Sequence, residues 1–174
     1  DPGGVLDLSR LTLDDVERVE IVRGPASVLY GSEAVTAVIQ LFTRSGAGPR
    51  AVRAEVGGGS YGARRTSLGA SGGAGRVQWT VQGDQHRSDG ILPFNNGYRN
   101  DGASARLALA PDGASDLRLT ARYNTSNYQY PTSSSGAVED RNAHSTQHRL
   151  MLGLDAGRRW NDRVLYYLRR LIDQ

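Results

Sequence analysis

The sequence predicts a mainly β protein in two parts, a short β-rich unit over residues 1–48 and about seven antiparallel strands over 49–174. Three observations predict this fold class. Two β-branched runs flank a Pro-started segment near the N-terminus. Beyond residue 49, apolar and polar residues alternate with a period of two, as in half-buried strands. The connections between these runs alternate between short glycine-rich turns and long polar loops.

The first unit is predicted to run strand, short helix, strand. Residues 16–23 mix β-branched apolar side chains with charged ones, which is typical of a strand with one wet face. Gly24 ends that strand, and Pro25 suits the first position of a helical turn that Gly31 would cap. Residues 37–43 are too few for an independent helix and are rich in β-branched and aromatic side chains, so they predict a second strand.

A glycine-marked joint, Ser45–Pro49, precedes the alternating strands. In each later run, apolar side chains at every second position predict one apolar face, and the residues between them predict one polar face. The expected strands cover 52–56, 66–71, 77–82, 103–109, 117–124, 149–155 and a last one from Arg163.

Short connections are expected at 72–75, 111–115 and 157–162, and long polar loops at 87–101 and 128–142. Transmembrane β-barrels have this asymmetry, because their periplasmic turns are short and their extracellular loops are long. In such a barrel the apolar face meets lipid, and Arg118, Arg122 and Arg149 line the lumen. In a soluble barrel the two faces would be exchanged, so the alternation by itself leaves both arrangements open.

Composition removes several function classes. No stretch approaches the roughly 18 apolar residues of a membrane helix, and the mean hydropathy is −0.48. The absence of cysteine removes disulfides, thiol catalysis and cysteine metal sites. All 21 basic residues are arginines, and they are scattered without an aromatic platform, which argues against nucleic-acid binding.

Several short motifs are compatible with an enzyme or a cofactor site, but ordinary turns and strands explain the same residues better. Residues 57–62 fit G-x-G-x-x-G, but a strand follows where a phosphate-binding helix is required. Ser60 and Ser71 each fit G-x-S-x-G, again without the helix of a nucleophile elbow. His144 and His148 would lie more than ~12 Å apart on a strand, too far to share a metal. No catalytic residue, cofactor or metal site is therefore predicted.

The loop over 84–101 also carries oxygen-bearing side chains suited to calcium, but their spacing matches no fixed ligand loop. Phe94, Tyr98, Tyr128 and Tyr130 are aromatic residues within the two long loops. They are candidates for an aromatic rim that touches a ligand, and an aromatic girdle at the membrane interface is an equally good interpretation.

The segment from residue 16 to 44 resembles the end of the plug domain of TonB-dependent outer-membrane receptors, whose pattern is approximately ERxEVxRGPxSxLYGxxAxxGVINIxT. Thr36 and Ala37 replace the usual glycine pair, and Gln40 replaces the usual asparagine. The matching residues are Glu17, Arg18, Glu20, Val22, Arg23, Gly24, Pro25, Ser27, Leu29, Tyr30, Gly31, Ala34, Val38, Ile39, Leu41 and Thr43.

This resemblance implies that residues 1–48 are the C-terminal part of a plug domain and that 49–174 are the N-terminal strands of an incomplete transmembrane β-barrel. Family members import scarce, bulky nutrients such as ferric siderophores, cobalamin or glycans across the outer membrane of Gram-negative bacteria, without catalysis. The implied partners are TonB, through a TonB box absent from this sequence, outer-membrane lipid, and a small-molecule or oligosaccharide ligand.

The resemblance also implies roles for individual residues. Glu20 and Arg23 correspond to charges that dock the plug on the barrel wall, and Gly24, Pro25, Leu29, Tyr30 and Gly31 form the plug motif. The sequence is expected to be a fragment, since a barrel of 22 strands needs several hundred residues. The alternative interpretation is a soluble or secreted β-rich ligand-binding module without membrane insertion.

Overall fold

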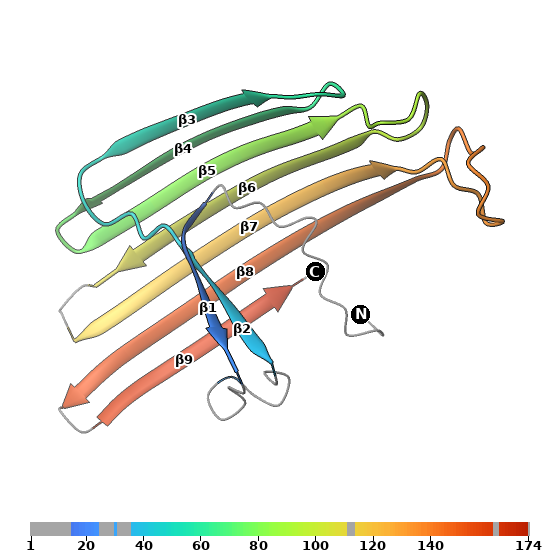
Figure 1. The fold of residues 1–174 in the computed structure, drawn as a ribbon. Coiled ribbons are helices and arrows are strands. Elements are labelled where there is room, and N and C mark those ends of the chain that lie inside the picture. Colours follow the sequence, from blue (N-terminus) through green and yellow to red (C-terminus); the bar gives the residue numbers. More distant parts are fainter. Residues whose placement is uncertain (1–14, 25–29, 31–35, 111–113, 162–163, 174) are drawn as a thin grey trace. The chain divides into compact units, whose positions relative to one another are not determined.

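The computed structural model describes residues 15–24, 30, 36–110, 114–161 and 164–173 (Figure 1). The chain divides into two units, Leu13–Arg44 and a second that comprises Asp1–Thr12 with Ser45–Gln174. The predicted boundary between residues 48 and 49 stays a prediction. The described strands are β1 (Val16–Arg23), β2 (Ala37–Thr43), β3 (Ala51–Gly58), β4 (Arg64–Ala74), β5 (Val77–Ser88), β6 (Tyr98–Leu109), β7 (Ser115–Gln129), β8 (His144–Asn161) and β9 (Val164–Asp173).

The smaller unit is an antiparallel pair of strands, β1 and β2, as the sequence predicts. Glu20 lies opposite Gln40, and Arg23 lies opposite Ala37. Gly24 follows β1 with a φ of +106°, a conformation that favours glycine, and its N–H donates to the carbonyl of Thr36. The helical turn predicted after Pro25 lies, apart from Tyr30, outside the described residues.

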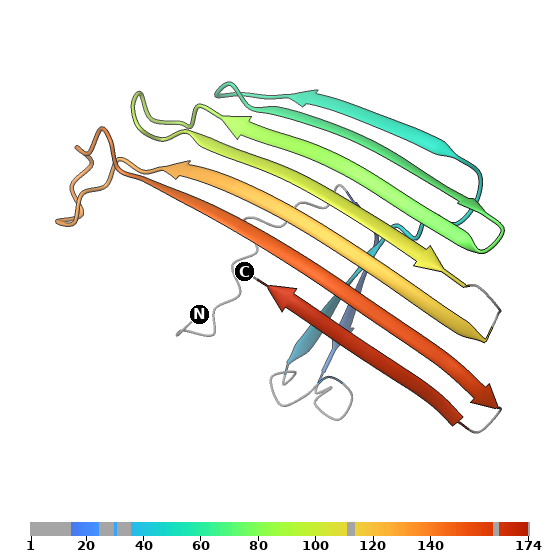
Figure 2. The same cartoon turned by 180° about the vertical axis from the view of Figure 1, so that it is seen from behind.

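The larger unit contains a sheet in which β3 to β9 lie side by side in chain order, each antiparallel to the next (Figures 1 and 2). The prediction of about seven antiparallel strands is confirmed. Each strand pairs with its sequence neighbours, because short turns or loops reverse the chain after every strand. The loops 89–97 and 130–143 lie at the same end of the sheet, which is called the long-loop end below.

Several strands are longer than predicted, and one predicted turn is wrong. Residues 157–161 continue β8, where Gly157 lies between Asp116 of β7 and Tyr167 of β9. Partners on both sides hold this glycine in a strand, although its flexibility and the polar residues after it resemble a turn. The chain reverses after Asn161 instead.

The glycine-marked joint packs closely on the sheet. Gly46 is buried with a φ of +73°, and a Cβ there would overlap the backbone carbonyl of Trp79. The carbonyl of Gly48 accepts a hydrogen bond of 2.8 Å from the N–H of Gly73. Glycine at position 46 is therefore required both by the backbone conformation and by the close approach to β5.

Candidate functional site

The cross-strand register gives the large sheet one apolar and one polar face. On the apolar face, Leu68 is 59%, Val52 77% and Val56 81% exposed. Within the described residues these side chains are exposed, as apolar side chains on a lipid-facing surface would be. The polar face carries the intervening side chains Ser67, Asp84, His86, Asn100, Arg106, Arg118, Arg122, Asn124, Ser126 and Arg149.

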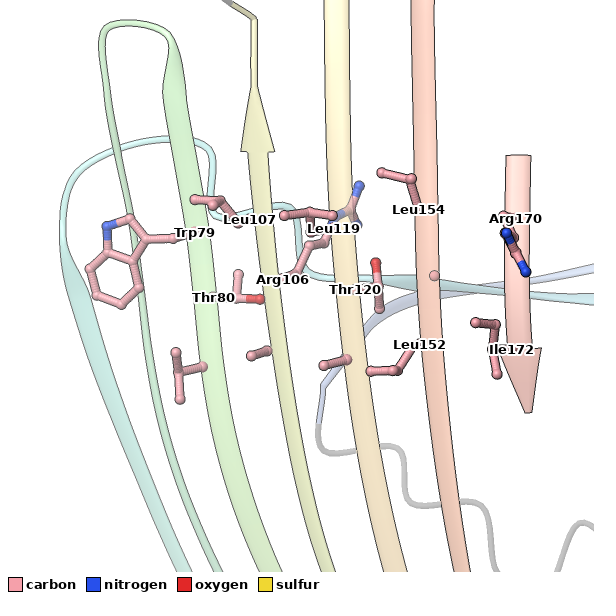
Figure 3. A pocket seen from close by; sticks show the side chains of 14 residues that line it. Trp79, Thr80, Arg106, Leu107, Leu119, Thr120, Leu152, Leu154, Arg170 and Ile172 are labelled. Atoms are coloured by element: carbon pink, nitrogen blue, oxygen red, sulfur yellow. The ribbon is translucent and has the colours of Figure 1, made fainter. Parts of the chain in front are cut away.

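The middle of the apolar face has an open hollow of about 780 Å³ (Figure 3). One cross-strand row joins Trp79, Leu107, Leu119 and Leu154, and it continues to Arg170 on β9. The adjacent row on the same face joins Val81, Ala105, Ala121, Leu152 and Ile172. Apart from Arg170, the side chains of these two rows are apolar, so most of the hollow suits hydrocarbon rather than a polar ligand. The lining also includes residues of the row between them, Thr80, Arg106, Thr120 and Gly153.

Three predicted aromatic residues come together on the polar side of the long-loop end. Tyr98 and Tyr128 are opposite each other on β6 and β7, with ring centroids 6.4 Å apart and an interplanar angle of 69°. Tyr128 also stacks on Tyr130, at 6.3 Å and 25°. Edge-to-face and stacked pairs of this kind hold rings in fixed orientations. The three rings form a continuous cluster, called the tyrosine cluster below.

A group of polar side chains lies on the same face of β5, β6 and β7, two to four residues from the row of Tyr98 and Tyr128. Asn100, only 1% exposed, accepts a hydrogen bond of 2.8 Å from the side-chain amide of Asn124. The side chain of Asp84, 7% exposed, crosses Gly102, where a Cβ would lie 2.6 Å from its Oδ1. His86 lies 4.0 Å from that carboxylate. Amide, carboxylate and imidazole groups so placed can hydrogen-bond a polar ligand that stacks on the tyrosines.

The two long loops are held together through Asn95, a residue that the sequence reasoning did not single out for this role. Its side-chain nitrogen lies 3.0, 3.2 and 2.9 Å from the carbonyl oxygens of Tyr130, Asp140 and Ala143. Its φ of +42° is in the left-handed region, which asparagine tolerates better than most residues. The neighbouring Asn96 accepts hydrogen bonds from the N–H groups of residues 91 and 92. The sequence signal that could have pointed to this role is the pair Asn95–Asn96 directly before Gly97.

Phe94 stands apart from the tyrosine cluster in its contacts. The guanidinium carbon of Arg141 lies 4.9 Å from the centre of its ring, a cation–π geometry. This contact adds a second link between the loops 89–97 and 130–143. Of the four predicted rim residues, Tyr98, Tyr128 and Tyr130 are therefore gathered in one place, and Phe94 joins the loop–loop packing.

The apolar face becomes polar toward the long-loop end. Its last largely apolar row is Gly83, Ala103, Tyr123 and Leu150, and the next is Gln85, Asp101, Thr125 and His148. Tyr123 marks the transition, since its hydroxyl lies 3.1 Å from Nδ1 of His148 and the two rings stack. An aromatic residue at the border of an apolar band is typical of a membrane interface.

Asp101 lies beyond that apolar band and pairs with Arg99 at 2.7 Å. Partial burial of Asp101 disfavours its charge, but hydrogen bonds from Arg99 and Gln85 and the charge of Arg99 outweigh this and lower its pKa. The same hydrogen bond and charge raise the pKa of Arg99. Both groups are therefore ionised at neutral pH.

The predicted plug residues are only partly within the described chain. Glu20 pairs with Arg18 at 3.0 Å, and Arg23 is exposed. The side-chain amide of Gln40, which replaces the usual asparagine, donates to the hydroxyl of Tyr30. Pro25, Leu29 and Gly31 lie outside the described residues. The docking role of Glu20 and Arg23 stays a prediction.

No group of three or more His, Asp or Glu side chains suited to a metal ion occurs in the described part of the chain. His144 bonds to the carbonyl of Asn142, and His148 to Tyr123, so the two histidines occupy separate environments. Within the same residues, no helix is long and apolar enough to cross a membrane.

An exposed apolar face, a polar face and alternating short and long connections are the features of outer-membrane β-barrels. Residues 1–38 match the family described as TonB-dependent Receptor Plug Domain. The vitamin B12 transporter BtuB of Photobacterium profundum is 26% identical over 138 residues, which are 75% of this chain and 23% of the transporter.

Solved structures agree with this class. The ferripyoverdine receptor of Pseudomonas aeruginosa superposes with a TM-score of 0.74 at 15% identity, over 92% of this chain and 24% of the receptor. The ferric enterobactin receptor of the same organism gives 0.71 at 18%, over 96% of this chain and 29% of the receptor. The structural likeness shows the fold, and the plug-domain match applies to residues 1–38.

The chain is therefore similar to TonB-dependent outer-membrane receptors, with the plug-domain match over residues 1–38 and the structural likeness over most of its length. It spans about a quarter of the length of the relatives it matches. The relatives are transporters and receptors, and the soluble binding module considered from the sequence is not favoured.

Proposed function

We propose that this chain is part of a receptor that binds a scarce, bulky nutrient outside the cell and imports it with energy supplied through TonB. The observation that carries the proposal is the tyrosine cluster on the polar face of the sheet, at the long-loop end. The names of the relatives, a vitamin B12 transporter and two ferric siderophore receptors, favour cobalamin or a ferric siderophore as the ligand. A glycan is the remaining candidate class. No catalytic step is part of this function.

Tyr98, Tyr128 and Tyr130 are proposed to contact the ligand directly. Their rings offer flat apolar surfaces and hydroxyl groups on fixed strands, and Asn100 and Asp84 supply polar groups below them. Aromatic side chains with a few placed polar groups are the usual composition of a small-molecule site. The loop–loop contacts would hold the site in shape before the ligand arrives, which lowers the entropy cost of binding.

Glu20 and Arg23 are proposed to dock the plug on the barrel wall. Glu20 already has an ion-pair partner in Arg18, whereas Arg23 ends β1 beside the plug motif and is exposed. Ion pairs in a wet lumen contribute little individually, so they can separate when TonB pulls on the plug.

The test is ligand binding by the full-length receptor that carries this chain, purified from outer membranes. Cyanocobalamin, ferric siderophores and oligosaccharides are titrated in turn against the wild type and against Tyr98→Ala/Tyr128→Ala. We expect one ligand class to bind and the double variant to lose about tenfold to a hundredfold in affinity, given about 0.5–1.5 kcal/mol beyond area burial for each aromatic contact.

Tyr123→Ala is the matched control, because Tyr123 is a tyrosine on the opposite face of β7. It is expected to leave ligand affinity unchanged. Equal losses in the control and the double variant would point to a general loss of folding, and unchanged binding in the double variant would refute the assignment of the tyrosines. Uptake that persists in cells without TonB would refute the transport proposal itself.

A further inference from the structure

The strand pair β1–β2 has both of its outgoing chain ends at the same end of the strands. Val16, the first residue of β1, lies opposite Thr43, the last residue of β2. Just beyond them, the N–H of Arg44 donates a hydrogen bond of 2.9 Å to the carbonyl of Asp15. A pull on the chain before Asp15 that is resisted after Arg44 therefore acts across the two strands. It separates them one cross-strand pair at a time, starting from this end, which is called the open end below.

The open end carries a side-chain contact that would resist the first step of this separation. The guanidinium carbon of Arg18 lies 4.3 Å from the centre of the ring of Phe42, which is the residue opposite it. The same guanidinium group pairs with Glu20 at 3.0 Å. A cation–π contact and an exposed ion pair are both modest interactions. Once they are broken, the remaining pairs of β1 and β2 take the load in turn.

Of the two sheets that the structure describes, the strand pair is the weaker under such a load. It has two strands, whereas the sheet of β3 to β9 has seven, and β4 to β8 each have a partner on both sides. A two-stranded hairpin alone is at best marginally stable in water, because its few cross-strand contacts hardly offset the entropy of ordering the chain. The strand pair should therefore open before the larger sheet loses a strand.

The joint that follows the strand pair is fixed to the larger sheet by its backbone. Gly46 is buried, and its backbone lies against the carbonyl of Trp79 so closely that a Cβ would overlap it. Gly73 lies under the joint, since a Cβ there would be 3.1 Å from the carbonyl oxygen of Gly46. The N–H of Gly73 also donates a hydrogen bond of 2.8 Å to the carbonyl of Gly48. A pull from the N-terminal side must break these contacts before it reaches β3.

We infer that the strand pair β1–β2 opens under load from its open end and that the contacts of Gly46 and Gly48 with the larger sheet are the point at which this opening ends. The inference rests on the proposed function, since TonB supplies the pull. The chain from Asp15 to Ser45 is then drawn out as extended polypeptide, while β3 stays paired with β4. These 30 residues extend by about 100 Å, at about 3.3–3.6 Å per residue.

The test is single-molecule force spectroscopy of the full-length receptor in a lipid bilayer, pulled through a bio-orthogonal handle at residue 14. The wild type is expected to lengthen in a step of about 100 Å and then to hold. Two engineered disulfides test the direction of opening, because this chain has no cysteine. Arg18→Cys/Phe42→Cys bridges the open end and should shorten the step to about 20 Å, whereas Val22→Cys/Val38→Cys bridges the far end and should leave about 50 Å.

Two glycine variants test the point at which opening ends. Gly46→Ala should let the step exceed 100 Å, because the added Cβ forces the joint away from β5. Gly48→Ala is the matched control, since Gly48 also has a positive φ but a Cβ there would meet no atom within 4 Å, and it should stop where the wild type stops. Equal steps in the two disulfide variants would overturn the opening from the open end. A wild-type step well beyond 100 Å, or equal steps in the two glycine variants, would overturn the role of the joint.

Uptake by cells separates this inference from the proposed function, because the force measurement needs no TonB. The oxidised variant Arg18→Cys/Phe42→Cys should import ligand more slowly than the wild type, and a reductant should restore the rate. Uptake by the oxidised variant at the wild-type rate, in cells that still require TonB, would overturn the inference alone. Uptake that persists without TonB would overturn the proposed function.

Discussion

Replacing Asn95 with alanine should separate the two long loops. The side-chain amide of Asn95 lies within 3.2 Å of the carbonyls of Tyr130, Asp140 and Ala143. An amide nitrogen has two hydrogens, so it forms about two full hydrogen bonds to these three acceptors. At a net 0.5–1.5 kcal/mol each, their loss costs about 1–3 kcal/mol. Alanine in the left-handed conformation adds about 1 kcal/mol, because its Cβ approaches a carbonyl oxygen.

The expected total of about 2–4 kcal/mol applies to local opening of the loops and corresponds to a factor of roughly 30 to 1,000 in the opening equilibrium. Hydrogen exchange followed by mass spectrometry measures this opening in the full-length receptor. Peptides that contain the N–H groups of Glu139 and Asp140, both bonded to the carbonyl of Pro131, should exchange faster by about that factor. Amides in the middle of β6 and β7 should keep their protection.

Two further variants separate the causes. Asn95→Gly removes the side chain but keeps a residue that accepts the left-handed backbone, so it should show the hydrogen-bond part of the effect alone. Asn142→Ala removes an exposed asparagine from the same loop as a matched control. Unchanged hydrogen exchange in Asn95→Ala, or an equal increase in the exchange rate in Asn142→Ala, would refute the conclusion that Asn95 holds the two loops together.

Three more outcomes are expected. Gly46→Ala should destabilise the sheet by about 1–3 kcal/mol more than Gly48→Ala in urea unfolding, because both glycines have positive φ but only the first meets backbone atoms of β5. Arg99→Gln should raise the pKa of Asp101 in a carboxyl NMR titration. Because the folded-state pKa of Asp101 is lowered, its charge stabilises the fold above the unfolded-state pKa near 4, and this stabilisation is lost as the pH falls through the folded-state pKa. The stability of the variant should therefore depend less on pH in that range. Arg23→Glu in the full-length receptor should loosen the plug and raise pore conductance, and unchanged conductance and uptake would rule out its docking role.

The sheet was predictable from sequence because its pattern repeats. Leu107 and Leu119, two apolar residues on separate strands, occupy the same face and the same row, as alternation requires. The tyrosine cluster was partly predictable, since Tyr98 and Tyr128 lie beside the two long loops, Tyr98 as the first residue of β6 and Tyr128 as the last residue but one of β7. Which rings touch depends on register, and composition does not encode register directly.

Other features needed the three-dimensional arrangement. Gly157 was assigned to a turn because glycine signals turns locally, whereas pairing on both sides keeps it in β8. Asn95 belongs to an asparagine pair that is typical of an ordinary turn. Its three carbonyl partners lie 35 to 48 residues further along the chain, so local sequence does not indicate them. Arg64, Arg87 and Arg99 are scattered in the sequence and become neighbours only through the registers of two strand pairs, β4 with β5 and β5 with β6.

The chain-order arrangement of β3 to β9 also bears on how the sheet assembles. Because every strand pairs with its sequence neighbours, each pairing closes only the connection between them. The turn between β4 and β5 has two residues (75–76), and the loop between β7 and β8 has fourteen (130–143). Loop-closure entropy, (3/2)RT ln n, makes the longer closure less favourable by about 1.7 kcal/mol. Local pairings of this kind favour fast folding, so the β4–β5 hairpin is positioned to form early and the β7–β8 pairing to follow once its loop is ordered.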